Sequence, residues 1–172
     1  RQRQMCIRDR LLRGKNLVGY KKYDDTVIDL FIKESSENGI NIFRIFDALN
    51  DINNISYSIE CANKYDSNSQ GTISYTTSPI HNEKYWLKLA KDIEDIGAKS
   101  LGIKDMAGLL KPKTAYSLIK KLKKNLNIPI HLHTHATTGL SDATNFKAFE
   151  AGVDLSLIHI SEPTRQLQIA YA

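Results

Sequence analysis

Residues 100–134 read SLGIKDMAGLLKPKTAYSLIKKLKKNLNIPIHLHT, and they hold one strand, one helix and a second strand. The β-rich runs 100–104 and 128–134 predict the two strands. Between them Pro112 stands where a helix begins, and an apolar stripe follows it at helical spacing: Ala115, Leu118, Ile119 and Leu122. The lysines of this segment fall mainly outside the stripe, so we interpret them as a solvated face rather than a phosphate-binding patch. A strand, helix and strand of this length are typical of a parallel sheet.

The same unit recurs about every thirty residues. Further strand-like runs lie at residues 42–46 and 71–76. Residues placed near the strand ends are 31, 30, 30 and 29 positions apart: Arg13, Arg44, Ser74, Lys104 and His133. Amphipathic patterns at residues 25–38 and 83–96 predict intervening helices, and glycines follow three helices where left-handed residues end them: Gly39, Gly97 and Gly152.

Uniform strand–helix units favour a barrel over other parallel sheets. A (β/α)8 TIM barrel needs about 250 residues at about this period. No G-x-G-x-x-G sequence follows a strand, so a dinucleotide-binding fold has no support. We predict an α/β fold that is a partial (β/α)8 TIM barrel, with roughly five of the eight βα units.

The two ends of the sequence differ from its middle. Residues 1–9, RQRQMCIRD, match a translated transposase-type sequencing adapter. Residues 155–165, LSLIHISEPTR, match the translated reverse complement of the partner adapter. We expect residues 1–10 and 155–172 to be non-native, adapter-like segments. Residues 11–154 are then the native partial barrel, with barrel units missing at both ends.

Composition excludes several classes of protein. The 172 residues are 41% hydrophobic and 25% charged, which is an ordinary globular composition. Residues 1–10 carry three of the five net positive charges, so residues 11–154 have a net charge of +2 and a nucleic-acid partner is not expected. No apolar run approaches the ~20 residues of a membrane span, and no signal peptide is expected. Two cysteines, Cys6 and Cys61, make no disulfide framework and favour a reducing compartment.

Residues 130–135, IHLHTH, give the strongest local signal of chemistry. Side chains alternate along a strand, so His131, His133 and His135 share one face. Catalytic residues of a TIM barrel lie at the C-terminal ends of its strands. We therefore favour His133 and His135 as a pair that converges on one metal ion, with hydrogen-bonded core histidines as the alternative.

Lys104, like His133 and His135, lies at the C-terminal end of its predicted strand. As a cation it would repel a metal ion held by two histidines. It could instead be deprotonated by burial, bind an anion, or carry CO₂ as a carbamate that donates oxygen to Zn²⁺ or Mn²⁺. A lysine that extends to solvent is the structural alternative.

Arg13 lies in the sequence Leu11-Leu12-Arg13-Gly14 at a predicted strand end. A guanidinium there suits the carboxylate of a substrate, to which it can donate two parallel hydrogen bonds. The structural alternative is an ion pair with a neighbouring acid such as Asp47.

Five motifs together carry a family resemblance. They are LLRGKNLVGY at residues 11–20, FRIFDALN at 43–50, GTISYT at 71–76, IKDMAGLL at 103–110 and HLHTHAT at 131–137. In this order and spacing they resemble the carboxyltransferase domain of biotin-dependent pyruvate and oxaloacetate enzymes. SPIH at residues 78–81 looks more like the oxaloacetate decarboxylase α subunit, or the separate B subunit of two-part pyruvate carboxylases.

The resemblance implies roles for individual residues. Lys104 would be a carbamylated metal ligand, His133 and His135 the histidine ligands, and Arg13 the group that holds the substrate carboxylate. In the family an aspartate ligand lies before the position of Leu11, and a proton-transferring threonine lies after that of Asp154. Tyr20, Arg44, Asp47 and Asp105 match motif positions, to which we assign no role.

The resemblance also implies a reaction and its partners. A carboxyl group moves between biotin and pyruvate or oxaloacetate beside a divalent metal: zinc, manganese or cobalt. Biotin would arrive on a carrier domain, and a biotin carboxylase or membrane decarboxylase subunits would complete a cytoplasmic, homo-oligomeric parent enzyme. One alternative is a metal-dependent barrel lyase or synthase with aldol or Claisen chemistry, whose relatives lack the lysine ligand. Another is that the 172-residue chain is a truncated fragment with no activity of its own.

Overall fold

The structure, a computed structural model, describes residues 8–159. Six strands form one parallel sheet in the order of the sequence. They are β1 (Asp9–Leu12), β2 (Ile42–Phe46), β3 (Asn68–Ser74), β4 (Ser100–Asp105), β5 (Ile130–His135) and β6 (Leu155–His159). Each of the first five strands is followed by a helix: α1 (Asp25–Glu37), α2 (Ile52–Lys64), α3 (Glu83–Asp95), α4 (Pro112–Asn125) and α5 (Ser141–Glu150).

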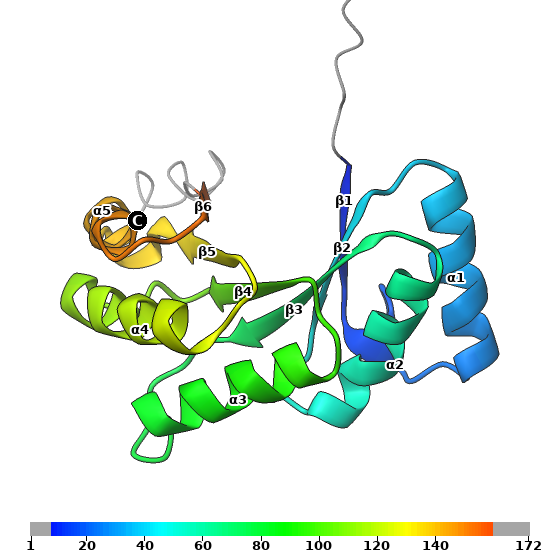
Figure 1. The fold of residues 1–172 in the computed structure, drawn as a ribbon, viewed down its shortest axis with the longest axis horizontal. Helices are drawn as coiled ribbons and strands as arrows, with labels where there is room; N and C mark the ends of the chain where they lie inside the picture. Colours follow the sequence, from blue (N-terminus) through cyan, green and yellow to red (C-terminus); the bar gives the residue numbers. More distant parts are fainter. Residues whose placement is uncertain (1–7, 160–172) are drawn as a thin grey trace, which may run out of the picture.

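The sheet curves, and the five helices lie along its convex side (Figure 1). Five βα units and a sixth strand in unbroken sequential order make a partial TIM barrel, so the predicted fold class is confirmed. Short turns of 3-10 helix, Gly14–Asn16 and Ala136–Thr138, follow β1 and β5. Within residues 8–159, none of the helices combines the length and the apolar character that crossing a membrane would require.

Local sequence explains most element boundaries. The three helix-ending glycines have positive φ angles, of 92° at Gly39, 88° at Gly97 and 94° at Gly152. The strand predicted at residues 71–76 lies instead at Asn68–Ser74, because the polar residues Asn68, Ser69 and Gln70 conceal its start. The strand predicted at residues 128–134 begins two residues later, at Ile130.

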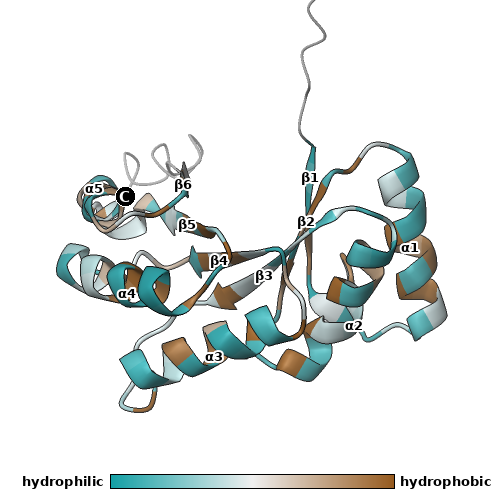
Figure 2. Cartoon of the chain, viewed as in Figure 1, coloured by the Kyte–Doolittle hydropathy of each residue, from teal (hydrophilic) through white to brown (hydrophobic). Residues whose placement is uncertain are grey.

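The hydrophobic core lies between the sheet and the helices. Outward-facing strand residues such as Phe43, Ile45 and Leu101 are fully buried against helix residues such as Ile32 and Ile119. Each helix carries both apolar and polar residues, as its two faces require (Figure 2). The inward-facing residues of the same strands include the charged side chains of Arg44 and Lys104, so the concave side of the sheet is where chemistry is possible.

Parts of the segments predicted to be non-native take part in the sheet. Asp9 and Arg10 pair with β2, and Leu155–His159 pairs with β5, in parallel register. Pairing does not test the origin of these residues, which stays a prediction. Residues 1–7 and 160–172, the remainder of the two segments, lie outside the described residues.

Candidate functional site

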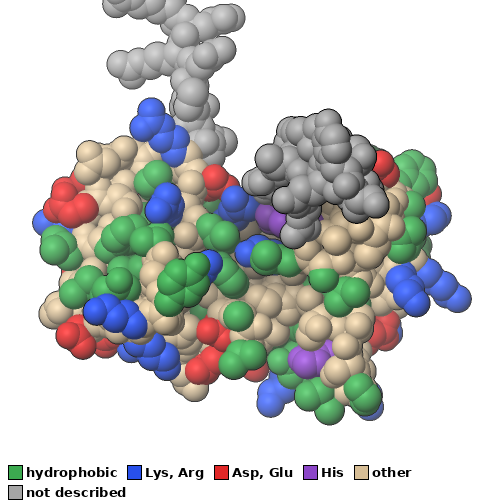
Figure 3. Space-filling view, turned by 180° about the vertical axis from the view of Figure 1, so that it is seen from behind, with side chains coloured by type: hydrophobic (Ala, Val, Ile, Leu, Met, Phe, Trp, Pro, Cys, Tyr) green, Lys and Arg blue, Asp and Glu red, His purple; other side chains and the backbone are tan. Residues whose placement is uncertain are grey.

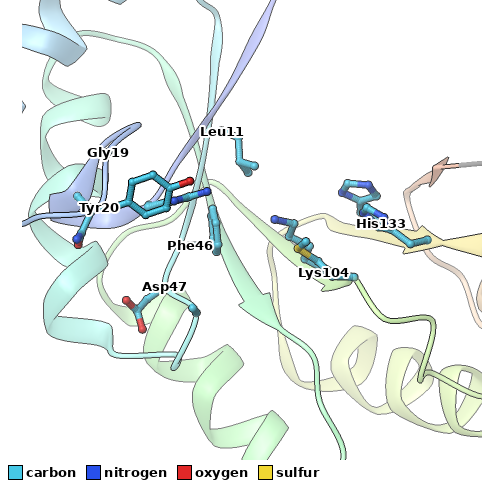
Figure 4. A pocket seen from close by; sticks show the side chains of 12 residues that line it. Leu11, Gly19, Tyr20, Phe46, Asp47, Lys104 and His133 are labelled. Atoms are coloured by element: carbon cyan, nitrogen blue, oxygen red, sulfur yellow. The ribbon is translucent and has the colours of Figure 1, made fainter. Parts of the chain in front are cut away.

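A cavity of about 600 Å³ opens at the C-terminal ends of β1, β2, β4 and β5. We call it the mouth pocket. It brings together all four side chains selected from the sequence: Arg13, Lys104, His133 and His135. Figure 4 shows Lys104 and His133 on adjacent strands, with Phe46 and then Tyr20 to the left of Lys104 in this view. Figure 3 shows the face of the molecule opposite to that of Figure 1. Near the centre of this face, lysine or arginine side chains lie beside a histidine.

The register of the sheet places the lysine beside the histidines. Lys104 of β4 is the Cα partner of His133 of β5, so the two side chains emerge side by side on the concave face. His135 lies two residues further along the same strand, and its ring centroid is 5.0 Å from that of His133 with 28° between the planes. The predicted common orientation of these histidines is present in the structure.

Lys104 is buried, with 6% of its surface exposed. Burial lowers the pKa of its amine, and the positive charges of Arg44 and Arg13 lower it further. The amine nitrogen lies 4.1 Å from the centroid of the Phe46 ring, a cation–π contact. A buried side chain rules out the alternative of a lysine extended to solvent. The lowered pKa gives this amine a larger neutral fraction than an exposed lysine has, and the neutral form is the one that can react with CO₂.

Arg13 directly follows β1 and points its guanidinium at Tyr20, with 4.7 Å between the guanidinium carbon and the ring centroid. Across residues 8–159, no carboxylate lies within 4.0 Å of this guanidinium. The alternative of an ion pair with Asp47 is therefore wrong. An arginine without a carboxylate partner in a pocket is suited to bind an anion.

Asp47 lines the mouth pocket, but its carboxylate accepts hydrogen bonds from its own loop and from the following helix. Its Oδ2 atom accepts hydrogen bonds from the backbone nitrogens of Leu49 (2.8 Å) and Asp51 (3.1 Å). Its Oδ1 atom accepts another from the Asn54 side chain at 2.7 Å. These three bonds brace the loop between β2 and α2, which explains why the carboxylate does not turn to Arg13.

Asp105 braces the loop after β4 in the same way. It is 1% exposed, and its two oxygens accept hydrogen bonds from the backbone nitrogens of Leu109 (2.9 Å) and Leu110 (2.8 Å). The loop packs on the end of β5, where a Cβ atom at Gly108 would lie 2.9 Å from the His135 carbonyl oxygen. Thr138 Oγ1 also donates to the Gly108 carbonyl at 2.8 Å. Asp105 thus fixes a loop that supports the backbone of His135.

Phe46 and Met106 also line the mouth pocket, and the sequence pattern predicted no role for them. Phe46 lies two residues after Arg44 on β2, so strand alternation alone puts it on the concave face. Its contact with Lys104 depends on the neighbouring strands and could not be found from spacing.

The imidazoles of His133 and His135 could supply two ligands to a divalent metal ion. Imidazole nitrogens suit zinc and other transition metals, and His133 and His135 supply two of them. In the part of the chain that is described, no group of three or more His, Cys, Asp or Glu side chains could hold a metal ion. Lys104 lies beside His133, so an oxygen carried on its side chain could add a third ligand to the two imidazoles.

Comparisons with known proteins bear on the family of the chain. Residues 27–158 match the family model HMGL-like. The chain is 49% identical over 145 residues to the pyruvate carboxylase B subunit of Methanocaldococcus jannaschii, covering 84% of this chain and 26% of that protein. It is 47% identical over 147 residues to the methylmalonyl-CoA carboxyltransferase 5S subunit of Propionibacterium freudenreichii subsp. shermanii, covering 84% and 29%.

The carboxyl transferase domain of Rhizobium etli pyruvate carboxylase, solved with pyruvate, has the same arrangement of strands and helices. Its TM-score is 0.86 at 39% identity, over 88% of this chain and 27% of that chain. The chain thus spans about a quarter of the length of these relatives. The family resemblance seen in the motifs is confirmed: this chain belongs to the HMGL-like family, and its partial barrel is that of a pyruvate carboxylase-type carboxyltransferase domain.

Proposed function

We propose that this chain is part of a biotin-dependent carboxyltransferase that acts on pyruvate or oxaloacetate. The observation that carries the proposal is the composition of the mouth pocket. It combines Arg13, which has no carboxylate partner among the described residues, with Lys104, whose amine is biased towards the neutral form, and the stacked imidazoles of His133 and His135. The relatives at 47–49% identity are a carboxylase and a carboxyltransferase, which favours this chemistry over aldol or Claisen cleavage.

Arg13 would bind the substrate carboxylate. Its guanidinium is held over the Tyr20 ring and is free to donate two parallel hydrogen bonds. Fixing the carboxylate in this way orients the methyl carbon of pyruvate towards the carboxyl donor, which lowers the entropic part of the barrier. The related Rhizobium etli domain was solved with pyruvate, which supports a substrate of this size and charge.

Lys104, His133 and His135 would hold a divalent cation, with Lys104 as a carbamate. Zinc, manganese and cobalt all accept this mixture of imidazole nitrogen and oxygen ligands. When bound, the metal would supply a Lewis acid for the ketone oxygen of the substrate. Phe46 excludes water from one side of the Lys104 amine, and the loop braced by Asp105 supports the His135 backbone.

Carboxyl transfer exchanges one bond to the carboxyl carbon for another. The methyl carbon of pyruvate loses a proton and forms a bond to the carboxyl carbon as the bond between that carbon and N1′ of carboxybiotin breaks. The proton ends on N1′, and the products are oxaloacetate and biotin. The reverse direction consumes oxaloacetate, and loss of CO₂ from the carboxybiotin so formed would make the enzyme a decarboxylase.

Partner proteins decide the direction of the reaction. A biotin carrier domain is needed in every case, whereas a biotin carboxylase would make the parent a carboxylase and membrane subunits would make it a decarboxylase pump. SPIH at residues 78–81 supports the oxaloacetate decarboxylase α subunit or the pyruvate carboxylase B subunit. We place the parent enzyme in the cytoplasm as a homo-oligomer.

The proposal is tested in the full-length enzyme that carries this segment. Radioactive pyruvate exchanges label with oxaloacetate when biotin carboxyl transfer is active. We expect exchange that needs biotin and is abolished by Arg13→Ala and by His133→Ala, while His81→Ala, which changes an imidazole outside the mouth pocket, retains it. Exchange that persists in the absence of biotin would refute the carboxyltransferase assignment.

A further inference from the structure

A second, smaller cavity lies on the concave face of the sheet, one layer of side chains below the mouth pocket. We call it the lower cavity. Its volume of about 10 Å³ is close to the least that holds one water molecule. Arg44, Gln70, Thr72 and His131 line it. Lys104 and His133 line both cavities, so their side chains separate the lower cavity from the mouth pocket.

Gly102 keeps the lower cavity open. A Cβ atom at this position would lie 2.7 Å from Thr72 Oγ1 and 3.0 Å from Gln70 Oε1. Its φ angle lies outside the positive range, so the backbone itself would accept another residue. The space around Gly102, rather than its backbone conformation, is what requires glycine here.

His131 has one ring nitrogen without a partner. The side chain is 7% exposed, and its Nδ1 atom lies 3.3 Å from Gln70 Oε1. Gln70 Nε2 donates to Ser100 Oγ at 3.4 Å, which turns the amide oxygen towards the ring. Nδ1 is then the donor, and Nε2 of the neutral ring is an acceptor. Nε2 is buried and has no hydrogen-bond partner in the described part of the chain. Buried polar atoms in native proteins are nearly always satisfied by protein or water.

We propose that one ordered water molecule occupies the lower cavity and connects His131 to Lys104. The water donates a hydrogen bond to His131 Nε2 and accepts one from the N–H of the Lys104 side chain. An amine and a carbamate both retain such an N–H, so the same water serves both forms. A water is the occupant that the volume admits, because inorganic anions and hydrated cations are larger.

His131 is accordingly a positioning residue that acts through this water. The hydrogen-bonded chain runs from Ser100 through Gln70 and His131 to the water, and it holds Lys104 from below at the level where His133 faces it. This role rests on the proposed function, in which Lys104 is a metal ligand. The presence of the water does not rest on the proposed function, because it is inferred from the lower cavity and from the unsatisfied His131 Nε2 atom.

The water is tested by crystallography of the full-length enzyme at a resolution that shows ordered solvent. We expect a density peak within hydrogen-bonding distance of His131 Nε2 and of the Lys104 side-chain nitrogen. In Gly102→Ala, whose added methyl group would displace the Thr72 and Gln70 side chains that line the cavity, the peak should be lost. A lower cavity without ordered water in the wild-type enzyme would overturn the proposal. This result needs only the wild-type crystal, so it can be obtained even if the variant does not fold.

The positioning role is tested by metal affinity, measured as bound zinc after dialysis against a series of buffered zinc concentrations. Groups that orient a metal ligand typically change affinity by about 10-fold or more, so we expect at least this loss in Gly102→Ala and His131→Asn. His81→Asn, which alters an imidazole that lines neither cavity, should bind zinc like the wild type. Unchanged affinity in both test variants would overturn the positioning role. A wild-type enzyme that binds no zinc, manganese or cobalt, yet shows the density peak, would instead overturn the proposed function.

Discussion

Lys104 and His133 are Cα partners across the parallel strands β4 and β5, and both side chains face the mouth pocket. This pairing puts a buried amine next to two stacked imidazoles at the C-terminal rim of a partial barrel. A cationic lysine in that place would oppose metal binding, whereas its carbamate would add an oxygen ligand to the two imidazoles.

Replacing the lysine should remove the metal. In Lys104→Ala of the full-length enzyme we expect loss of bound zinc or manganese and of carboxyl exchange, because the variant lacks the oxygen ligand that we assign to this side chain. Elemental analysis of the purified protein measures the metal content. Lys120→Ala, at an exposed position on α4, is the control and should keep both properties. Full metal content in Lys104→Ala would contradict the carbamate assignment.

Metal uptake should depend on CO₂ and on pH. Burial, Arg44 and Arg13 all lower the pKa of the Lys104 amine, so its neutral fraction near pH 8 exceeds that of an exposed lysine. We expect the metal-stripped enzyme to take up zinc slowly in CO₂-free buffer and faster when bicarbonate is added. At a constant concentration of dissolved CO₂, the rate should rise with pH up to the lowered pKa of Lys104 and then level off, as stopped-flow measurement with a zinc indicator can follow. Uptake that is indifferent to bicarbonate would exclude carbamate formation.

Arg13→Lys should impair pyruvate binding selectively. An ammonium group keeps the charge but loses the paired hydrogen bonds, each worth about 1.5–3 kcal/mol at a charged group. We expect KM for pyruvate to rise about 10-fold or more, while KM for free biotin changes little. Steady-state exchange at varied pyruvate and biotin gives both values, with Lys22→Arg at an exposed position as the control. Equal effects on the two constants would count against a carboxylate-binding role.

Asp105→Asn should destabilise the site without removing a ligand. The carboxylate accepts hydrogen bonds from two backbone N–H groups, and an amide can accept only one while its NH₂ group meets the other donor. We expect a loss of about 1–3 kcal/mol in unfolding free energy, measured by urea denaturation of the full-length enzyme. Asp142→Asn, in the exposed first turn of α5, should be nearly neutral. An unchanged unfolding free energy in Asp105→Asn would show that the loop does not depend on these two hydrogen bonds.

The 172-residue chain expressed alone should be inactive and prone to aggregate. β1 and β6 are the edge strands of the described sheet, and unpaired edges invite association with other chains. Light scattering and an oxaloacetate decarboxylation assay check this expectation. A monomeric chain with a cooperative melt and measurable activity would refute it.

Hydrophobic periodicity is a local property of the chain, so it predicts the repeated strand–helix unit and, with it, the barrel. Alternation along β5 likewise put His131, His133 and His135 on one face before any tertiary contact was considered. The same reasoning located Arg13 and Lys104 at strand ends.

Which of these residues meet depends on how the strands and helices pack. Each pair of neighbouring parallel strands is connected through a helix, so their register depends on how that helix packs and not on a short turn. That packing set Lys104 opposite His133, directed Asp47 to its own loop instead of Arg13, and enclosed His131 with Gln70 in a lower layer. Contacts between residues about thirty or sixty positions apart cannot be predicted from the spacing of residues in a single sequence. Such contacts depend on the sum of many small packing energies along the intervening helices.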